Sequence, residues 1–583
     1  MSGAGRVLGG ALAAPAVRKI MGFTLAGYRV PPSATDKSPS SRSFRAERAR
    51  RDIIGEWRQT TGAAVPSGPD DRVGSDAVPG NPRPRTVNPV RLGDLAARAG
   101  AVPPEGAEVA VTGVTHASQE VRPGDLYAAL PGARRHGAEF AAAAAEAGAV
   151  AVLTDPAGVA LAAAAGLPTL VVDDPRAVLG DVAATVYGDS TAGLTVIGVT
   201  GTAGKTSTSY LIESGLRAAG HTTGLIGTVE TRLGDLVIDS VRTTPEATDL
   251  HAMLAVARER GVDAVVMEVS SHALAMGRVG GVRFTVGGYT NFGSDHLDFH
   301  ADEADYFAAK AKLFDGRCQV EVLNHDDPAL RPLFKPATVS YSAAGDPAAT
   351  WWADGVEGEG YTQRFTVHGP DGLTLPTGVA LPGRHNVANA LLAIATLVAA
   401  GVDPATAAAG VAACGGVPGR LELVSGDAPV RGVVDYAHKA NAIEAVLAAL
   451  RQLTAGRLIC VVGAGGDRDR GKRPTMGAAA AQGADVVLVT DDNPRSEDPA
   501  AIRAEVLAGA YAAGTGARII EAPGRRAAIE EAVRVAEPGD IVALLGKGQE
   551  RGQEVNGEVL PFDDRVELAE ALRARFGDLV GQR

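Results

Sequence analysis

A glycine-rich turn between an apolar run and a helical pattern is the first feature of the sequence that could do chemistry. Gly198, Gly201 and Gly204 are spaced three residues apart, and Lys205-Thr206 follows directly. Glycines at such a turn let backbone N–H groups point at phosphate oxygens, and the start of the next helix adds its positive dipole end. The lysine can reach the outer phosphates, and the threonine hydroxyl can hold Mg²⁺. The strict phosphate-loop pattern needs glycine where Val199 stands, yet this variant spacing still favours nucleotide binding.

A second group of reactive side chains follows the strand predicted over Ala264–Val269. Glu268 lies near its carboxyl end, where a carboxylate close to a phosphate loop is well placed as a hard oxygen ligand. His296 comes next, and Lys310 lies in a helical pattern downstream. Taken alone, His296 would be a hydrogen-bonded structural histidine and Lys310 a solvated helix lysine.

A third candidate site is the string Asp492-Asn493-Pro494-Arg495, which follows the predicted strand Val486–Thr490. Ligand sites form at such strand ends in parallel sheets. The guanidinium fork of Arg495 can clamp a carboxylate with two hydrogen bonds, while Asn493 can read an amine or amide. Read locally, the same string is also a turn with an exposed arginine.

Short Val/Ile/Leu runs alternate with Ala-rich helical patterns from Val90 onward, which predicts parallel α/β sheets. A glycine-rich break at 415–419 and the start of a new strand near 194 suggest domain boundaries near 418 and 190. The predicted buried strands are Val150–Leu153, Thr169–Val172, Leu194–Val199, Ala264–Val269, Arg457–Val462, Val486–Thr490 and Ile541–Leu545.

Four segments are therefore expected: a disordered basic tail over 1–88, and three α/β domains over 89–190, 191–418 and 419–583. The tail carries 14 Lys and Arg against 7 Asp and Glu, and it is rich in turn residues. Such a composition buries too little apolar surface to offset the entropy of ordering.

Composition excludes several classes of protein. The 583 residues are 45% apolar and 21% charged, so the chain is globular, and three widely spaced cysteines exclude a disulfide scaffold. A net charge of −12 argues against nucleic acid as a partner, and no apolar run is long enough to span a membrane. We expect a soluble, cytoplasmic monomer.

The glycine spacing resembles that of the Mur ligase family and its folylpolyglutamate synthetase relatives. Further motifs agree in order over residues 88 to 583: Gly383-Arg-His-Asn, Gly419-Arg420, Val433-Val-Asp435 and Gly546-Lys-Gly-Gln-Glu550. The resemblance implies an α/β fold of three domains, in which a UDP-substrate-binding domain precedes a central P-loop ATPase domain and a C-terminal Rossmann-like domain. Folylpolyglutamate synthesis is disfavoured, because that relative lacks the separate first domain and the Asp-Asn-Pro-Arg string.

The resemblance also implies roles for individual residues. The expected catalytic residues are Lys205, Glu268, His296 and Lys310, and the expected Mg²⁺ ligands are Thr206, Glu268, His296 and Lys310 carbamylated by CO₂. ATP would contact Gly201, Thr202, Ala203, Gly204, Lys205, Thr206 and Ser207, with Asn386 and Asn389 near adenine and ribose, Arg420 near phosphate, and Asp435 positioning the nucleotide. The UDP-linked substrate would meet Ser118, Thr243, Thr244, Ser270 and Arg278. The amino-acid substrate would meet Arg468, Asp492, Asn493, Pro494, Arg495, Gly546 and Glu550.

The implied reaction is ATP-dependent amide formation through an acyl phosphate. The selectivity string resembles that of the family member that adds meso-diaminopimelate to UDP-N-acetylmuramoyl-L-alanyl-D-glutamate during peptidoglycan precursor synthesis. ATP and Mg²⁺ are the expected cofactors. Because ATP contacts would come from both sides of the boundary near 418, we expect domain closure on nucleotide binding.

Some positions depart from the usual family pattern. Gln119 and Ser294 stand where the family usually has arginine, Gln549 where it has histidine, and Ala440-Asn441 where it has Pro-Asp. Loss of two cations near anionic ligands leaves two alternatives open. One is an amide ligase of specialised metabolism with a different acyl substrate, and the other is a non-catalytic sensor of the nucleotide-linked precursor.

Overall fold

The computed structural model describes residues 81–132, 134–426 and 428–577. The tail predicted over 1–88 lies outside the described residues as far as residue 80. Residues 81–88 make specific contacts: Arg83 forms a 2.6 Å salt bridge with Asp125, and the backbone N–H groups of Arg85 and Thr86 donate to the carboxylate of Glu259. The described chain thus begins inside the stretch that we expected to be disordered.

A four-stranded parallel sheet in the order β3-β4-β5-β6 forms the first α/β unit. Its apolar side chains pack against α3 and α6 on one face and against α4 and α5 on the other. The elements of this unit are β1 (Val90–Arg91), α3 (Leu92–Arg98), β2 (Ala110–Val111), β3 (Gly113–Thr115), β4 (Asp125–Ala128), α4 (Ala141–Glu146), β5 (Ala151–Thr154), α5 (Val159–Ala162), β6 (Thr169–Val171) and α6 (Pro175–Val186). Strands β1 and β2 pair with each other in a separate two-stranded sheet.

An eleven-stranded sheet forms the second unit, in the order β10-β9-β8-β11-β7-β12-β13-β14-β15-β16-β17. The seven strands in the middle of this order, β8-β11-β7-β12-β13-β14-β15, are parallel to one another. Antiparallel strands that the sequence patterns did not reveal extend both edges, β9 and β10 on one side and β16 and β17 on the other. The strands are β7 (Thr195–Thr200), β8 (Thr223–Ile226), β9 (Glu230–Leu233), β10 (Leu236–Asp239), β11 (Ala264–Glu268), β12 (Phe284–Tyr289), β13 (Cys318–Asn324), β14 (Val339–Ser342), β15 (Trp351–Glu359), β16 (Thr362–His368) and β17 (Thr374–Val379).

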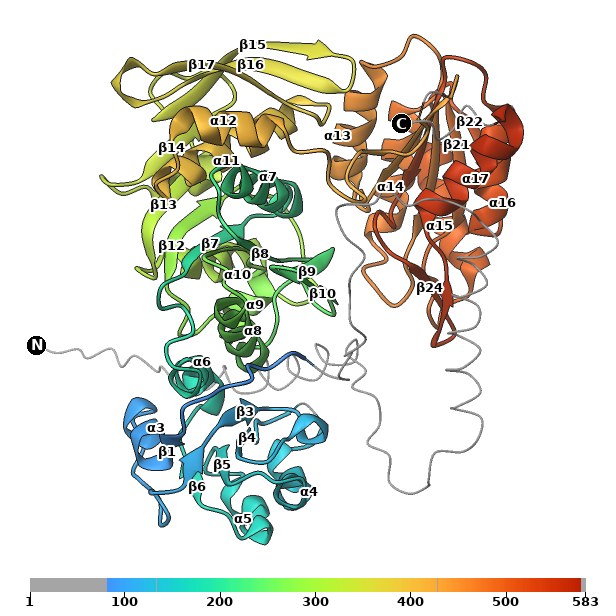
Figure 1. Cartoon of the computed structure of the whole chain (residues 1–583). Coiled ribbons are helices and arrows are strands. Elements are labelled where there is room, and N and C mark those ends of the chain that lie inside the picture. The colour runs from blue at the N-terminus through green and yellow to red at the C-terminus, as the bar shows by residue number, and fades with distance from the viewer. Residues whose placement is uncertain (1–80, 133, 427, 578–583) are drawn as a thin grey trace, which may run out of the picture. The chain divides into compact units, whose positions relative to one another are not determined.

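Helices cover this central sheet on both faces (Figure 1). α7, α11 and α12 pack on one face, while α8 and α9 pack on the other. The helices are α7 (Lys205–Ala218), α8 (Ala247–Glu259), α9 (Ser271–Ala275), α10 (Glu303–Ala311), α11 (Arg384–Ala399) and α12 (Pro404–Ala412).

A six-stranded sheet in the order β18-β19-β23-β20-β21-β22 forms the third unit, and all of its strands except β18 are parallel. α13 to α15 pack on one face and α16 and α17 on the other. The elements are β18 (Glu422–Leu423), β19 (Arg431–Asp435), α13 (Ala440–Arg451), β20 (Leu458–Ala464), α14 (Lys472–Gly483), β21 (Val486–Asp491), α15 (Pro499–Ala512), β22 (Arg518–Glu521), α16 (Arg525–Val535), β23 (Ile541–Leu545), β24 (Gly552–Val555), β25 (Glu558–Pro561) and α17 (Asp564–Phe576).

All seven strands predicted from apolar runs are present, so the predicted α/β class with parallel sheets is confirmed. Local signals also explain several helix starts. Asp174, Asp403 and Asp498 each precede a proline at the first helical position, and each carboxylate accepts a backbone N–H of the first turn. A capping carboxylate and a proline with a preset φ both favour starting a helix there.

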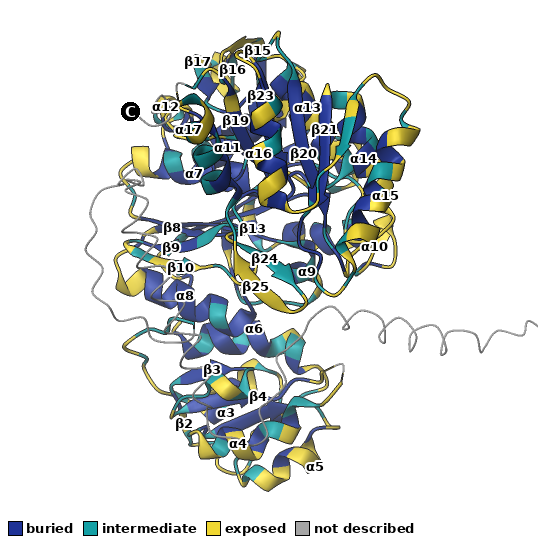
Figure 2. Ribbon diagram, turned by 90° about the vertical axis from the view of Figure 1, so that its right-hand side faces the viewer, coloured by how far each residue is buried: buried dark blue, intermediate teal, exposed yellow. Residues whose placement is uncertain are grey.

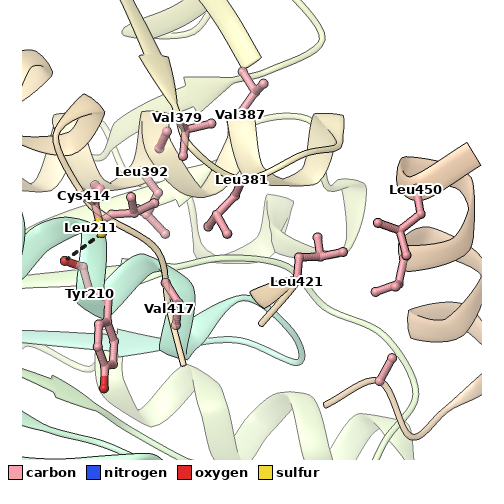
Figure 3. Packing of buried hydrophobic residues seen from close by; sticks show 14 of the residues in the cluster. Tyr210, Leu211, Val379, Leu381, Val387, Leu392, Cys414, Val417, Leu421 and Leu450 are labelled. Carbon is pink, nitrogen blue, oxygen red and sulfur yellow. Dashed lines mark hydrogen bonds between the residues drawn. The ribbon is translucent and has the colours of Figure 1, made fainter. Parts of the chain in front are cut away.

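The largest buried apolar cluster runs from the helices of the central sheet to those of the third sheet. Figure 3 shows Leu211, Val387 and Leu392 packed beside Leu381, with Leu421 lying between this group and Leu450 of α13. Figure 2 shows that the central strands of both sheets are buried, while the edge strands and the outer faces of the helices are partly exposed. This packing holds the strand ends that carry the polar residues described next.

Candidate active site

The predicted phosphate loop connects β7 to α7, as its sequence pattern requires. Gly201 and Gly204 have φ angles of 139° and 86°, in the region that favours glycine. A Cβ atom on Gly204 would lie 2.5 Å from Oδ1 of Asn389 in α11, so this position has no room for a side chain. The asparagine that we expected near the adenine or ribose therefore lies against the loop itself.

Lys205 is held by the loop that precedes it. Its Nζ donates hydrogen bonds of 2.8 Å to the Gly201 carbonyl oxygen and 3.2 Å to that of Thr202. Burial lowers the pKa of Lys205, and the nearby carboxylate of Glu268 opposes that shift. The lysine is thus an internal cation at the start of α7, where an anion would stabilise its charged form.

Thr206 and Glu268 lie together because β7 and β11 are neighbouring parallel strands. The Thr206 hydroxyl donates to the Glu268 carboxylate, with distances of 3.1 and 3.0 Å to its two oxygens. Glu268 is 2% exposed, and it also accepts the backbone N–H of Thr228 at 2.8 Å. Hydroxyl and carboxylate oxygens are hard ligands, so this pair fits Mg²⁺.

Lys310 of α10 is 1% exposed and lies beside the same loop. Its Nζ donates to the Gly201 carbonyl oxygen at 2.7 Å and lies 4.7 Å from the centre of the Tyr306 ring. Burial lowers the pKa of Lys310 well below its usual value, and the positive charge of Lys205 lowers it further. A neutral amine is therefore favoured at this position.

His296 has a different immediate partner from the other predicted metal ligands. Its Nε2 lies 3.2 Å from Oδ2 of Asp295, and its backbone has a φ of 52°, which is unusual for a residue with a side chain. Within the residues that the structure describes, no three His, Cys, Asp or Glu side chains converge as a metal site. A metal site here would therefore need oxygen ligands of other kinds, such as the Thr206 hydroxyl.

Residues of the third sheet reach the same place. Nη2 of Arg420 lies 3.3 Å from the Thr206 hydroxyl, and its guanidinium carbon lies 4.4 Å from the centre of the Tyr436 ring. The Asp435 carboxylate accepts the backbone N–H groups of Leu421 and Ala437, both at 2.7 Å. Asp435 thereby fixes the turn that carries Arg420.

A salt bridge that sequence reasoning missed joins Lys439 to Asp295. Lys439 precedes the Ala440-Asn441 pair noted as a departure from the family pattern. That departure was the only available signal, because nothing in either local sequence marks two residues 144 positions apart as partners.

The Asp-Asn-Pro-Arg string lies after β21, as predicted, and Arg495 forms a β-bridge with Val555 of the β24–β25 hairpin. Nε of Arg495 donates to the Glu554 carboxylate at 3.0 Å, and Nη1 donates to the Gly466 carbonyl oxygen at 2.7 Å. Arg495 has a φ of 54°. A guanidinium held from two sides in this way is preorganised, while Glu554 supplies a counter-charge that a substrate carboxylate could replace.

The other residues predicted to bind the amino-acid substrate differ in their surroundings. Asp492 is buried, and a Cβ on Gly546 would lie 2.6 Å from its Oδ2, which explains the glycine. Pro494 lies against Gly466. Arg468 is exposed in the loop after β20. The Glu550 carboxylate accepts hydrogen bonds from Asn493 and from Lys547, a lysine that we did not predict to belong to the site.

The residues predicted for the UDP-linked substrate lie in two units. Ser118 begins a 3₁₀ turn after β3. The Thr244 hydroxyl donates to the Glu268 carbonyl oxygen at 2.9 Å and accepts the backbone N–H of Ser270 at 3.1 Å. The hydroxyl oxygens of Thr243 and Thr228 lie 3.0 Å apart. Ser270 caps α9, and Arg278 forms a 2.9 Å salt bridge with Glu246. Thr243, Thr244 and Ser270 are therefore brought close to Glu268.

Three segments of the chain match domain models of one protein family. Residues 110–187 match the Mur ligase family catalytic domain, residues 199–397 the Mur ligase middle domain, and residues 419–548 the Mur ligase glutamate ligase domain. The chain belongs to the Mur ligase family. The predicted resemblance is thus confirmed, and this Mur ligase is an ATP-dependent ligase.

Relatives within the family are similar over most of their length. A Streptomyces coelicolor protein named UDP-N-acetylmuramoyl-L-alanyl-D-glutamate–2,6-diaminopimelate ligase is 55% identical over 86% of this Mur ligase and 99% of its own length. A Leifsonia xyli protein named UDP-N-acetylmuramyl-tripeptide synthetase is 47% identical over 80% and 92%, respectively. A solved structure of a diaminopimelate ligase has 31% identity and a TM-score of 0.61 and covers 84% of this chain and 99% of its own.

No helix among the described residues of this Mur ligase is both long enough and apolar enough to cross a bilayer.

Proposed function

We propose that this Mur ligase joins meso-2,6-diaminopimelate to UDP-N-acetylmuramoyl-L-alanyl-D-glutamate, with conversion of ATP to ADP and phosphate, in peptidoglycan precursor synthesis. The observation that carries the proposal is the polar cluster after β21, where Arg495 is bonded to Glu554 and Glu554 is linked through Asn493 to Glu550. A zwitterionic end with one carboxylate and one ammonium matches the charges of Arg495 and Glu550. Relatives that carry this name, at 55% and 44% identity, support the same substrate.

ATP would bind at the start of α7. The backbone of Gly201 to Gly204 would cradle the phosphates, with Lys205, Thr206 and Ser207 following at the helix N-terminus. Lys205 and Arg420 would neutralise phosphate charge from two sides. Asn386 and Asn389, whose side chains are hydrogen-bonded to each other at 3.0 Å, would lie near the adenine and ribose.

The side chains present fit a divalent cation. Thr206, Glu268, His296 and carbamylated Lys310 would hold Mg²⁺, which when bound would neutralise the negative charge of the phosphates. Carbamylation needs the neutral amine that burial favours at Lys310. Its nitrogen forms a bond to the carbon of CO₂ and loses one proton, so that the neutral amine becomes an anionic carbamate with two oxygen ligands.

The proposed reaction has two steps. A carboxylate oxygen of the D-glutamyl group attacks the γ-phosphorus, and the bond between this phosphorus and the oxygen that bridges to the β-phosphate breaks. ADP departs, and the glutamyl group becomes an acyl phosphate. The diaminopimelate amine then attacks the acyl carbon, loses a proton, and expels phosphate from the tetrahedral intermediate. Positioning and charge neutralisation supply most of the rate in such a transfer, which accounts for cations converging on the loop.

The acyl substrate would lie between the first and central sheets. Ser118 would contact the uridine diphosphate, while Thr243, Thr244, Ser270 and Arg278 would contact the sugar and dipeptide. The closeness of Thr244 to Glu268 supports this assignment, because it brings the peptide contacts next to the phosphate loop.

A second candidate function is an amide ligase with another acyl substrate. Gln119 and Ser294 favour it, because each replaces an arginine that the family usually places near an anionic ligand. Each lost hydrogen bond to a charged group weakens binding by about 1.5–3 kcal/mol.

A substrate panel tests both candidates. The full chain, supplied with ATP, Mg²⁺ and bicarbonate, should release ADP and form a new amide by mass spectrometry with UDP-N-acetylmuramoyl-L-alanyl-D-glutamate and diaminopimelate. The second candidate would be favoured if diaminopimelate is joined to a different acyl acid and not to UDP-N-acetylmuramoyl-L-alanyl-D-glutamate. Absence of ADP and amide with every pair would overturn both and leave a sensor.

We further propose that the protein acts as a monomer in the cytoplasm. The three cysteines are buried free thiols, as suits a reducing compartment. Light scattering of the purified chain at working concentration checks its mass.

A further inference from the structure

Lys547 follows β23 and has no solvent-exposed surface. Its Nζ donates three hydrogen bonds: 3.1 Å to Oδ1 of Asn493, 3.0 Å to Oε2 of Glu550 and 2.7 Å to the Gly552 carbonyl oxygen. An ammonium group has three protons, so all of its donors are used. The side chain cannot reach a substrate without breaking this arrangement.

The same network uses up most of the Asn493 side chain. Its Oδ1 accepts a second hydrogen bond, from the backbone N–H of Glu554 at 2.9 Å, and its Nδ2 donates to Oε2 of Glu550 at 2.9 Å. Both lone pairs of the amide oxygen are therefore occupied. The Asn493 side chain therefore supports Glu550, the carboxylate that the family resemblance also places at the amino-acid substrate.

Glu550 has one fixed oxygen and one available oxygen. Oε2 accepts from both Lys547 and Asn493, whereas Oε1 makes no hydrogen bond to any residue that the structure describes. The Glu550 side chain is 32% exposed, so a ligand can approach it. A buried cation needs an anionic partner, and Glu550 is the carboxylate bonded to Lys547.

We propose that Lys547 is a positioning residue for the amino-acid substrate: it fixes Glu550 so that Oε1 receives the far ammonium group of diaminopimelate. This inference rests on the proposed function. Preorganisation of this kind spares the substrate the cost of ordering the carboxylate and makes the site selective for a substrate that carries the second amine.

The test compares diaminopimelate with 2-aminopimelate, which has the same two carboxylates but lacks the far amine. Full-length wild type should prefer diaminopimelate in kcat/KM. Lys547→Met should lower that preference at least about tenfold. The reason is that Glu550 would lose its fixed orientation, which affects only diaminopimelate, the substrate whose far ammonium bonds to it. The KM for ATP should stay within about twofold, and Lys547→Arg should recover part of the preference.

Arg457→Met is the matched control. Arg457 forms a 2.7 Å salt bridge with Asp540, and the two residues precede β20 and β23, at the amino ends of strands whose carboxyl ends face Lys547. Its loss should lower stability and leave the preference unchanged. A purely structural role for Lys547 would make the two variants behave alike, which would overturn the inference.

A double variant tests whether Lys547 acts through Glu550. Glu550→Gln should lower the preference by itself, and adding Lys547→Met should lower it no further, because the two side chains form one unit. Additive losses would contradict the inference. If Lys547→Met yields no folded protein, Asn493→Ala breaks the same network, and an unchanged preference would then count against it.

The two levels of proposal fail differently. Wild-type protein that forms no amide with diaminopimelate would overturn the proposed function and this inference with it. Active wild type together with an unchanged preference in the Lys547 variant would overturn the inference alone.

Discussion

Nζ of Lys310 donates a 2.7 Å hydrogen bond to the carbonyl oxygen of Gly201, across 109 residues of sequence. The bond places a buried amine on the loop that would hold the ATP phosphates. Since Lys205 donates to the same carbonyl oxygen, two lysines converge on one point of the loop. Two adjacent ammonium groups repel each other, which favours a neutral or carbamylated Lys310.

Lys310→Ala should lower turnover at least about a hundredfold, because the variant loses the anionic oxygens that carbamylation would supply. Removal of CO₂ and bicarbonate should also slow the wild type. ADP release in a coupled assay measures both effects. Lys312→Ala is the control, since Lys312 is exposed two residues away. A Lys310→Ala enzyme with near-normal turnover would rule out this role, and ligand binding without any turnover in the wild type would favour a sensor.

Thr206→Val should raise the Mg²⁺ concentration needed for half-maximal turnover, by about tenfold or more, because it removes one hard oxygen ligand. Glu268→Gln should act in the same direction, since it removes the negative charge next to the hydroxyl. Thr206→Ser keeps the hydroxyl and should remain close to wild type. Magnesium titration of the initial rate gives the comparison, and an unchanged requirement in the valine variant would contradict the assignment.

Arg495→Lys should raise the KM for diaminopimelate by about tenfold to a hundredfold, because a single ammonium cannot reproduce the two-pronged contact of a guanidinium. The KM for ATP should be unaffected. Arg534→Lys, an exposed change on α16, serves as the control. Equal KM values for the amino acid in Arg495→Lys and wild type would show that the carboxylate binds elsewhere.

Asp249 of α8 should make stability depend on pH. Burial raises the pKa of Asp249 to about 6, so the folded protein holds this proton where the unfolded chain, with a pKa of about 3.9, has lost it. As the pH rises from about 4 to about 6, the free energy of unfolding of the wild type should therefore fall by up to about 2–3 kcal/mol relative to that of Asp249→Asn. Urea unfolding of both proteins at several pH values measures the difference. A constant difference across this range would contradict the shift.

Nucleotide binding should draw the central and C-terminal parts together, because ATP would be contacted from both sides of the predicted boundary at 418, by Lys205 before it and by Arg420 after it. Small-angle scattering should give a smaller radius of gyration with ATP analogue and Mg²⁺ than without. Lys205→Met, which should bind the phosphates weakly, should show a smaller change. Identical profiles for the wild type in both conditions would count against closure.

Sequence by itself determined the local units of this protein. Continuous apolar runs fixed the seven predicted strands, and the spacing of Gly201 and Gly204 fixed the turn between β7 and α7, because both features depend on neighbouring residues only. The order of motifs was likewise enough to identify the family. The antiparallel strands at both edges of the central sheet were missed, because none of them is a continuous apolar run: β9 and β10 have four residues each, and β16 and β17 alternate more buried with more exposed residues.

Tertiary structure alone decided which side chains meet. It placed Asn389 against Gly204 of the phosphate loop, and it joined Asn493 to Lys547. These contacts join residues that lie 54 or more positions apart, so no short-range propensity encodes them. They follow from the register of parallel strands and from the burial of polar groups, each of which must find a partner once water is excluded.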